Sequence, residues 1–285
     1  MTLTKDWLRK FGWPETLVTG HPLAIAHRGA SDYAPENTLK SFRIAADLCS
    51  EMWELDIRVS ADGVCVVAHD DNLTRVARRS LRVSEARWNE IAALRLPEEQ
   101  HIPRLEEIIE LAQQTGCGLY IEVKSEGAGP LAWKLLKAAG FRFAALVSFN
   151  PIWIGELREM GCDYPLGILV PTGADPFSYL SGVDVDIVHP CWRDASDTPN
   201  ELLTDKLMAR FAERGHQIVI WHEDRATVLD ALWEKPIMGI CSNRPELLKP
   251  YRPDPATPIE IVCHRGANNL APENTLEAAR ICADQ

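Results

Sequence analysis

The sequence predicts an α/β fold, an eightfold (β/α) TIM-type barrel with a short C-terminal strand–helix extension. Buried-strand patterns and amphipathic-helix patterns alternate almost without interruption from residue 23 to residue 241. Repeated strand–helix units form parallel sheets, and eight such units in about 220 residues close into a barrel. An open sheet would usually carry a Gly-x-Gly-x-x-Gly turn after a strand, and the sequence has none.

The strands are expected at short apolar runs. The first is residues 23–26, and the second, residues 53–59, is followed by the turn Asp62-Gly63 and a hairpin partner at 64–68. We treat that hairpin as an extension of the second strand. The remaining strands are expected at residues 119–123, 145–149, 166–170, 186–189, 217–221 and 237–241.

Helices are expected in the intervals. In residues 38–49 the apolar side chains recur on one face, and Asn37 or Thr38 is a suitable N-cap. The other helices are expected at residues 84–94, 104–114, 130–139, 152–160, 176–180, 200–214 and 225–233.

The composition is that of a soluble globular protein, with 46% hydrophobic and 25% charged residues. The net charge of −11 disfavours nucleic acid as a partner, and the absence of an apolar run of about 18 residues predicts no membrane span. Residues 1–12 are charged rather than apolar, and the eight cysteines form no Cys-x-x-Cys pair. We therefore expect a cytoplasmic protein without a disulfide framework.

Polar residues follow the predicted strands, where the active site of such a barrel lies. These candidates are His27, Arg28, Glu54, Asp56, His69, Glu122 and Lys124. The spacing of two between Glu54 and Asp56 places both carboxylates on one face of a strand. With Glu122 they form the oxygen set that Mg2+ or Ca2+ prefers, and the absence of cysteine disfavours zinc.

The other candidates suit the chemistry of a phosphate ester. Arg28 and Lys124 can hold an anion. His27 and His69 can divide acid and base work, because the ordinary histidine pKa is near neutrality. One divalent cation, two cationic side chains and two histidines around one pocket suggest attack on a phosphodiester.

With these residues in place, the sequence resembles the glycerophosphodiester phosphodiesterase family over residues 20–250. The matching text, in family order, is His27-Arg28-Gly29, Pro35-Glu36-Asn37-Thr38, Glu54-Leu55-Asp56, Asp62-Gly63, His69-Asp70, Leu73-Thr74-Arg75, Glu122-Val123-Lys124, Ser148-Phe149 and Trp221. The resemblance implies a barrel enzyme that hydrolyses glycerol phosphodiesters with a divalent cation. It implies His27 and His69 as the acid/base pair, metal binding by Glu54, Asp56 and Glu122, phosphate binding by Arg28 and Lys124, and Trp221 as a pocket wall.

The sequence departs from the family pattern at the rim of the pocket. The family's Thr-Asp-Arg-Pro, for example, reads Ser242-Asn243-Arg244-Pro245. The sequence therefore leaves the identity of the substrate alcohol open. A sugar-phosphodiester (agrocinopine-like opine) hydrolase is an alternative to a glycerophosphodiesterase. The first nucleophile, water or a substrate hydroxyl, is also open. A non-catalytic binding scaffold is the alternative from another class, although it predicts loss of at least one of the seven polar positions.

The opening motif is repeated near the C-terminus. Residues 260–285 match residues 23–48 in register at an offset of 237, so His264 corresponds to His27. The proline-rich residues 251–258 predict a linker before this copy. The copy lacks the later carboxylates, so we expect no second active site. Its predicted strand at 259–263 needs cover, and we expect a homodimer with contacts through residues 259–285.

Overall fold

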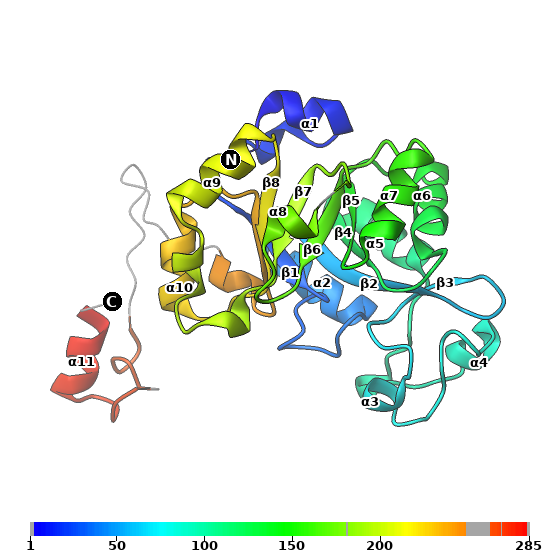
Figure 1. Cartoon of the computed structure of the whole chain (residues 1–285). Coiled ribbons are helices and arrows are strands. Elements are labelled where there is room, and N and C mark those ends of the chain that lie inside the picture. The colour runs from blue at the N-terminus through cyan, green and yellow to red at the C-terminus, as the bar shows by residue number, and fades with distance from the viewer. Residues whose placement is uncertain (1–2, 181, 249–262, 269, 284–285) are drawn as a thin grey trace. The chain divides into compact units, whose positions relative to one another are not determined.

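The chain divides into two compact units, residues 1–249 and 250–285. The computed structural model describes residues 3–180, 182–248, 263–268 and 270–283 (Figure 1). The predicted linker at 251–258 lies outside the described residues, as does all of the predicted strand at 259–263 except Cys263. Within the described parts of the chain, no helix has the length and apolarity needed to cross a membrane.

The first unit is a closed barrel of eight parallel strands, as predicted. Its strands are β1 (Leu23–His27), β2 (Met52–Val59), β4 (Gly118–Val123), β5 (Ala144–Ser148), β6 (Leu166–Val170), β7 (Ile187–Pro190), β8 (Gln217–Ile220) and β9 (Gly239–Ser242). Each strand pairs with its neighbours in this order, and pairing of β1 with both β9 and β2 closes the circle. The short strand β3 (Cys65–Val67) runs antiparallel to β2, which confirms the predicted hairpin extension.

Helices surround the barrel (Figure 1). The α-helices of this unit are α1 (Lys5–Phe11), α2 (Leu39–Asp47), α3 (Thr74–Ala77), α4 (Trp88–Ala92), α5 (Leu105–Thr115), α6 (Ala128–Ala138), α7 (Pro151–Glu159), α8 (Pro176–Tyr179), α9 (Asp205–Glu213) and α10 (Ala226–Trp233). Short 3-10 turns occur at η1 (Glu15–Leu17), η2 (Pro97–Glu99), η3 (Arg193–Ala195), η4 (Pro199–Leu202) and η5 (Pro245–Leu248).

Strand β2 shows how the sequence sorts its side chains between the barrel interior and the helices. Trp53 faces outward and packs on Phe42 of α2, with ring centroids 5.2 Å apart. The alternate residues Glu54 and Asp56 therefore face inward, because successive side chains of a strand point to opposite sides. All of these residues are buried. Buried carboxylates need partners, and β2 places both Glu54 and Asp56 at the same end of the barrel.

Two predicted helices differ from the observed ones. The helix expected at 84–94 is only α4: the Ser84 N–H is bound to Asp71, and the Trp88 N–H, the first of α4, donates to Asp62, which caps the helix at that residue. The helix expected at 200–214 is divided into η4 and α9. The Thr204 side chain accepts from the Leu207 N–H and starts α9 there.

Helix α1 was not predicted. Its apolar side chains join an aromatic cluster in which Trp7 contacts Trp13, and Trp13 packs edge-on against Phe143 at 4.9 Å. Phe143 immediately precedes β5, so α1 covers the N-terminal ends of the strands, opposite the predicted site. The short charged pattern of the helix, KDWLRKF, carries too few apolar positions for a clear helical period.

The segment between β3 and α5 has its own small apolar core. Its buried members are Val66, Ala68, Leu73, Ala77, Val83, Ala86, Ile91, Leu94, Leu96 and Ile102. The segment includes α3 and α4, which lie beside the barrel in Figure 1. This core fixes the loop that follows β3, and that loop carries the predicted His69.

The second unit contains α11 (Leu276–Ala283) and the turn before it. The turn repeats the backbone of the first copy of the motif. Positive φ values of 63°, 78° and 59° occur at Arg265, Gly266 and Asn274, and values of 54°, 80° and 56° occur at Arg28, Gly29 and Asn37. The hydrogen bonds agree as well: Asn274 N–H donates to the Arg265 carbonyl at 3.0 Å, as Asn37 N–H does to the Arg28 carbonyl.

Candidate active site

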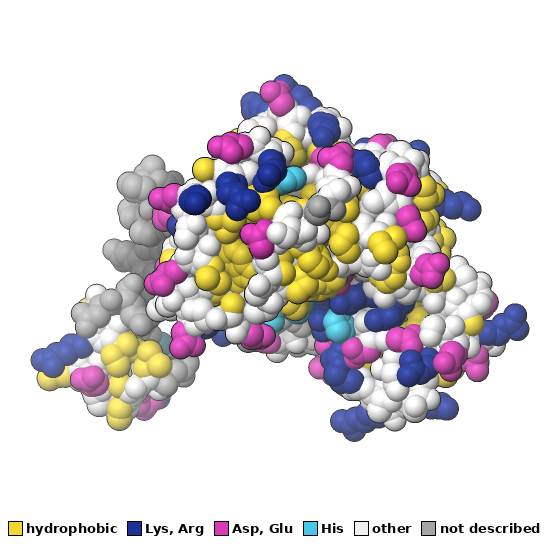
Figure 2. All heavy atoms as spheres, viewed as in Figure 1, with side chains coloured by type: hydrophobic (Ala, Val, Ile, Leu, Met, Phe, Trp, Pro, Cys, Tyr) yellow, Lys and Arg dark blue, Asp and Glu magenta, His cyan; other side chains and the backbone are white. Residues whose placement is uncertain are grey.

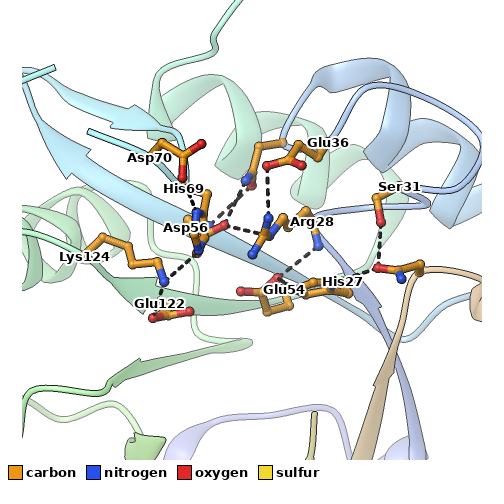
Figure 3. A network of polar contacts seen from close by, with 12 residues as sticks. His27, Arg28, Ser31, Glu36, Glu54, Asp56, His69, Asp70, Glu122 and Lys124 are labelled. Carbon is orange, nitrogen blue, oxygen red and sulfur yellow. Dashed lines mark hydrogen bonds and ion pairs between the residues drawn. The ribbon is translucent and has the colours of Figure 1, made fainter. Parts of the chain in front are cut away.

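The structure brings all eight predicted residues to the C-terminal end of the barrel, and Figure 3 shows seven of them in one polar network. The strand register explains part of this. His27 of β1 is the neighbour of Glu54 of β2, and Asp56 of β2 is the neighbour of Glu122 of β4. Three adjacent strands thus present one histidine and three carboxylates on the same inner surface.

The turn after β1 aims Arg28 at this cluster. Arg28 has a φ of 54° and Gly29 a φ of 80°. A Cβ atom on Gly29 would lie 2.7 Å from the Ser41 carbonyl carbon, closer than such atoms approach, so the position requires glycine. The Arg28 carbonyl accepts a hydrogen bond from Ser41 Oγ at 3.0 Å, which ties the turn to α2.

Asn37 holds Asp56 from the start of α2. Its amide nitrogen donates to Asp56 Oδ2 at 2.9 Å, and its amide oxygen accepts from the Asp56 backbone N–H at 3.3 Å. Arg28 Nε lies 3.2 Å from the same Oδ2. Arg28, after β1, and Asn37, before α2, therefore fix the orientation of the Asp56 carboxylate.

Glu54, Asp56 and Glu122 form a buried acidic cluster. One oxygen from each lies within 4.8 Å of the others. Burial and the neighbouring Asp56 raise the pKa of Glu54 well above its usual range and the pKa of Glu122 to about 7. Burial acts in the same direction on Asp56, but Arg28 and Lys124 outweigh it and lower the pKa of Asp56 to about 2.

The donor set of this cluster fits a hard divalent cation. All three ligands are carboxylates, which Mg2+ and Ca2+ prefer. Asp56 Oδ1 is buried and receives no hydrogen bond within the described residues, although Lys124 Nζ lies 3.5 Å away. Three carboxylates face two contacting cationic side chains, Arg28 and Lys124, so the cluster holds one more acidic group than basic groups. The cluster could therefore bind a metal ion.

Two cationic side chains border the cluster. Lys124 Nζ lies 2.7 Å from Glu122 Oε1, and Arg28 also contacts Glu36 at 3.1 Å. Arg58 fixes the backbone around them, because its guanidinium donates to the carbonyl oxygens of His69 and Lys124 at 2.9 and 3.2 Å. Arg58 was not among the predicted residues. It links the loop after β3 to the end of β4.

His27 is buried, and each of its ring nitrogens has a different neighbour. Nδ1 lies 2.7 Å from Asn243 Oδ1, and Nε2 lies 3.9 Å from Glu54 Oε2. His222 stacks on the imidazole ring at 4.7 Å, and Trp221 meets it edge-on at 5.5 Å. Burial, together with Arg28 and His222, lowers the pKa of His27 well below its usual range.

His69 is more exposed and has a carboxylate partner. Its Nδ1 bonds Asp70 Oδ1 at 2.7 Å, and the other Asp70 oxygen accepts from Arg75 Nε at 2.6 Å. Arg75 in turn donates both terminal nitrogens to Glu36 at 2.7 Å. Since Glu36 also binds Arg28, a chain of charged groups links His69 to Arg28. Burial lowers the pKa of His69, and the Asp70 hydrogen bond opposes that shift.

Several residues of the site were given no role by the sequence. Asn243 directly follows β9 and Asp224 lies four residues after β8, and His222, also after β8, contacts His27. The signal that could have found them is their position after a barrel strand, where polar residues converge. His189 of β7 is fully buried beside Tyr120.

A groove of about 500 Å3 opens beside Glu122 and Lys124. Its remaining walls include Val123, Ser148, Phe149, Asn150, Pro151, Trp153 and Tyr179. Trp221 packs edge-on against Phe149 at 6.4 Å, so it stands between this wall and His27. Figure 2 shows hydrophobic side chains over α8 and the neighbouring strands, and a histidine among charged side chains near α3.

The whole arrangement matches a known family of proteins. Residues 27–247 match the model of the glycerophosphoryl diester phosphodiesterase family. A glycerophosphodiester phosphodiesterase of Caldanaerobacter subterraneus is 26% identical over 240 residues, which cover 79% of this chain and 96% of that protein.

Solved structures show the same fold. A glycerophosphodiester phosphodiesterase of Agrobacterium tumefaciens superposes with a TM-score of 0.69 and 24% identity, covering 79% of this chain and 97% of that one. An Oleispira antarctica phosphodiesterase in complex with sn-glycerol-3-phosphate gives a TM-score of 0.69 and 22% identity, covering 80% of this chain and 96% of that one.

Proposed function

Since the chain belongs to the glycerophosphoryl diester phosphodiesterase family and is a phosphoric diester hydrolase, we propose that it hydrolyses a small soluble glycerophosphodiester to an alcohol and glycerol phosphate. The observation that carries this proposal is the buried cluster of Glu54, Asp56 and Glu122, bordered by Arg28 and Lys124. A phosphodiester is a small anion, and this combination offers both metal ligands and cationic side chains to it.

Glu54, Asp56 and Glu122 are the residues that would hold one divalent cation, Mg2+ or Ca2+, which when bound supplies Lewis-acid polarisation of the phosphoryl group. Arg28 and Lys124 would bind the phosphate oxygens. Both are already held in place by carboxylates, so little side-chain freedom is lost when substrate binds. Charge that develops on the phosphate oxygens in the transition state would meet these fixed cations.

His27 and His69 would move the protons. Figure 3 shows His27 beside Glu54, and His69 is close enough to Asp56 for the charge of that carboxylate to act on its pKa. One histidine would accept the proton of the attacking hydroxyl, and the other would donate a proton to the leaving alcohol oxygen. The attacking hydroxyl belongs to water or to the substrate's own glycerol. Detection of a cyclic glycerol phosphate in a quenched reaction would identify the second route.

The test is release of glycerol phosphate from a panel of substrates. Protein freed of metal by a chelator should be inactive on glycerophosphocholine, glycerophosphoethanolamine and glycerophosphoinositol, and Mg2+ or Ca2+ should restore at least one activity. Glu122→Gln should lose activity by at least about a hundredfold, because it removes a metal ligand. Full metal-dependent activity in His27→Ala would contradict the proposed acid/base pair.

A sugar-phosphodiester hydrolase is the second candidate. The groove beside Lys124, at about 500 Å3, is larger than a glycerol or a small amino alcohol requires, and aromatic rings line it. The same panel, extended with sugar phosphodiesters of the opine class, separates the two candidates. Activity on sugar phosphodiesters with none on any glycerol substrate would replace the first proposal with the second.

We also propose a cytoplasmic homodimer with contacts through residues 259–285. The eight cysteines are free thiols, which suits a reducing compartment. Leu270 and Leu276 of the second unit are 67% and 80% exposed, which suits a contact surface. Exchange of this copy for residues 23–48 of a partner is disfavoured, because Ala279 corresponds to the buried Phe42 and would leave a cavity. Light scattering of a chain ending at Pro250 should show a smaller assembly, and an unchanged number of subunits would contradict the dimer.

A further inference from the structure

His27 is connected to two residues that follow the last two strands of the barrel. Its Nδ1 lies 2.7 Å from the side-chain oxygen of Asn243. The side-chain nitrogen of Asn243 donates to Asp224 Oδ2 at 2.8 Å. We call the three residues His27, Asn243 and Asp224 the β8–β9 relay.

The carboxylate of Asp224 sets the orientation of the Asn243 amide. A carboxylate only accepts hydrogen bonds, and Asp224 accepts three: from the Asn243 side chain, from the Asn243 backbone N–H at 3.0 Å and from Ser242 Oγ at 2.6 Å. A reversed amide would place its oxygen 2.8 Å from a carboxylate oxygen, an unfavourable contact of two acceptors. The Asn243 oxygen must therefore face His27.

An amide oxygen has no proton to donate, so the hydrogen in the bond to Asn243 belongs to His27 Nδ1. Ser31 Oγ donates to the same oxygen at 2.9 Å and completes its coordination. A neutral imidazole carries one N–H, and Nε2 is then the nitrogen with the lone pair. Nε2 is buried and has no hydrogen-bond partner within the described part of the chain.

Aromatic packing prevents the ring from reversing this arrangement by rotation. His222 lies parallel to the His27 ring, at 4.7 Å and an interplanar angle of 13°. Trp221 closes a second side of the ring at 5.5 Å. A half-turn of the imidazole would sweep through both neighbours. Aromatic packing thus fixes the plane of the His27 ring, and the hydrogen bond to Asn243 fixes its tautomer.

We propose that Asp224 and Asn243 are positioning residues that hold His27 as its Nδ1–H tautomer, so that Nε2 is the proton acceptor of the reaction. The inference rests on the proposed function for the role of His27, and it divides the work of the two histidines. His69, whose Nδ1 is bonded to Asp70, is the other histidine of the site. His69 is then the proton donor to the leaving alcohol.

The tautomer can be read directly by NMR of the full-length protein labelled with 15N-histidine. The nitrogen that carries the hydrogen and the one with the lone pair differ in chemical shift, and His27→Gln identifies the signals of this residue. Wild-type protein should show the hydrogen on Nδ1 of His27. A spectrum with the hydrogen on Nε2 would overturn the proposal, whether or not the protein hydrolyses any substrate tested.

Asp224→Asn tests whether Asp224 determines the tautomer of His27. An amide at position 224 can also donate, so the Asn243 amide is free to reverse and offer its NH2 group to His27. We expect His27 signals from the Nε2–H form and a kcat reduced by about 10–100-fold with KM nearly unchanged. In Asn243→Asp one oxygen still accepts from Nδ1, while the other meets Asp224 Oδ2 and the two carboxyl groups must share a proton, so the tautomer should be retained. An unchanged His27 spectrum in Asp224→Asn would overturn the proposal.

Glu246→Gln is the matched control. Glu246 follows β9, as Asn243 does, and binds Tyr33 and Arg244 outside the relay. The same acid-to-amide change there should alter neither the His27 signals nor kcat. If Asp224→Asn changes the spectrum while kcat stays at the wild-type value, the assignment of His27 as the proton acceptor is overturned. Loss of all glycerophosphodiesterase activity in the wild type would instead refute the proposed function.

Discussion

At the scale of single residues, the site depends on backbone conformations that side chains rarely adopt. Arg28 and Asn37 both have positive φ, and both contact Asp56. Such conformations cost about 1–3 kcal/mol each and persist only where the surroundings enforce them. The enforcing contacts are the local hydrogen bonds that both copies of the turn share, here from the Asn37 N–H to the Arg28 carbonyl and from the Ala30 N–H to the Ser41 carbonyl. The turn held in this way presents Arg28 and Asn37 to the Asp56 carboxylate.

Gly29→Ala should damage both stability and activity. The new methyl group would meet the Ser41 backbone at 2.7 Å, at a φ of 80°. We expect the free energy of unfolding to fall by about 1–3 kcal/mol and kcat/KM to fall with it, because Arg28 is displaced. Gly63→Ala is the control: its φ is 83°, but nothing lies within 4 Å of the added atom. Equal loss of activity in both variants would contradict a specific role for the Gly29 turn.

Asp70→Asn should slow the reaction without unfolding the protein. The change removes the carboxylate that bonds His69 Nδ1 and that receives Arg75. We expect kcat to fall by about 10–100-fold, since an amide supports a protonated imidazole less well. Asp163→Asn, an acid-to-amide change on the outer surface beside Trp133 and Arg142, should leave kcat unchanged. A wild-type kcat in Asp70→Asn would show that the His69–Asp70 bond is not used.

At the scale of elements, the strands could be predicted and the short connecting pieces could not. Buried strands such as β5 and β6 are nearly continuous apolar runs, and that signal depends only on the local sequence. The shortened α4 depends on carboxylates at Asp62 and Asp71, which are distant in sequence from the N–H groups they capture. Helix α1 becomes recognisable only from the aromatic cluster that connects its Trp7 through Trp13 to Phe143. The helix propensity of the local sequence contains no information about such tertiary contacts.

The site residues likewise divide into those that a local sequence pattern predicts and those that depend on tertiary contacts. Residues such as Glu54 and Asp56 could be predicted because a spacing of two on a strand is a local pattern. Asn243 and Asp224 could not, because their role depends on pairing around the barrel, which brings β9 beside β1. A polar residue after a strand indicates a position near the site. It does not indicate which other residue it will contact.

Thr204→Ala should destabilise α9 and leave catalysis intact. The Thr204 side chain accepts from the Leu207 N–H at 3.3 Å and marks the point where η4 gives way to α9. We expect a loss of about 1 kcal/mol in the free energy of unfolding, measured by urea denaturation, with unchanged kcat/KM. Thr204→Ser keeps the accepting oxygen and should recover most of the loss. A wild-type stability for Thr204→Ala would show that the cap does not define the helix start.

At the scale of the whole molecule, the barrel interior contains a titratable group that links stability to pH. His189 is fully buried on β7, and burial lowers its pKa to about 3. In the unfolded chain a histidine has a pKa near 6.5. Between these values the unfolded chain binds a proton that the folded barrel does not. Acid therefore favours unfolding through this residue.

Stability should fall as pH decreases from about 6.5 toward 3, with a contribution from His189 of up to about 1.4 kcal/mol per pH unit. Above pH 6.5 this contribution is constant, because the ring is neutral in both states. His189→Gln should have a shallower pH dependence of the free energy of unfolding over this range. Parallel pH curves for the two proteins would contradict the assignment of a neutral His189 in the folded barrel.

The repeated turn of the second unit has a consequence for how the first one is built. The described residues 263–268 and 270–283 reproduce the Arg–Gly–Asn backbone, although this copy has no β2 of its own. The turn is therefore determined by contacts within about twenty residues, and contacts so close in sequence form early in folding. We expect the loop that aims Arg28 to be in place before β9 pairs with β1. The barrel then closes around a site in which the turn that carries Arg28 has already formed.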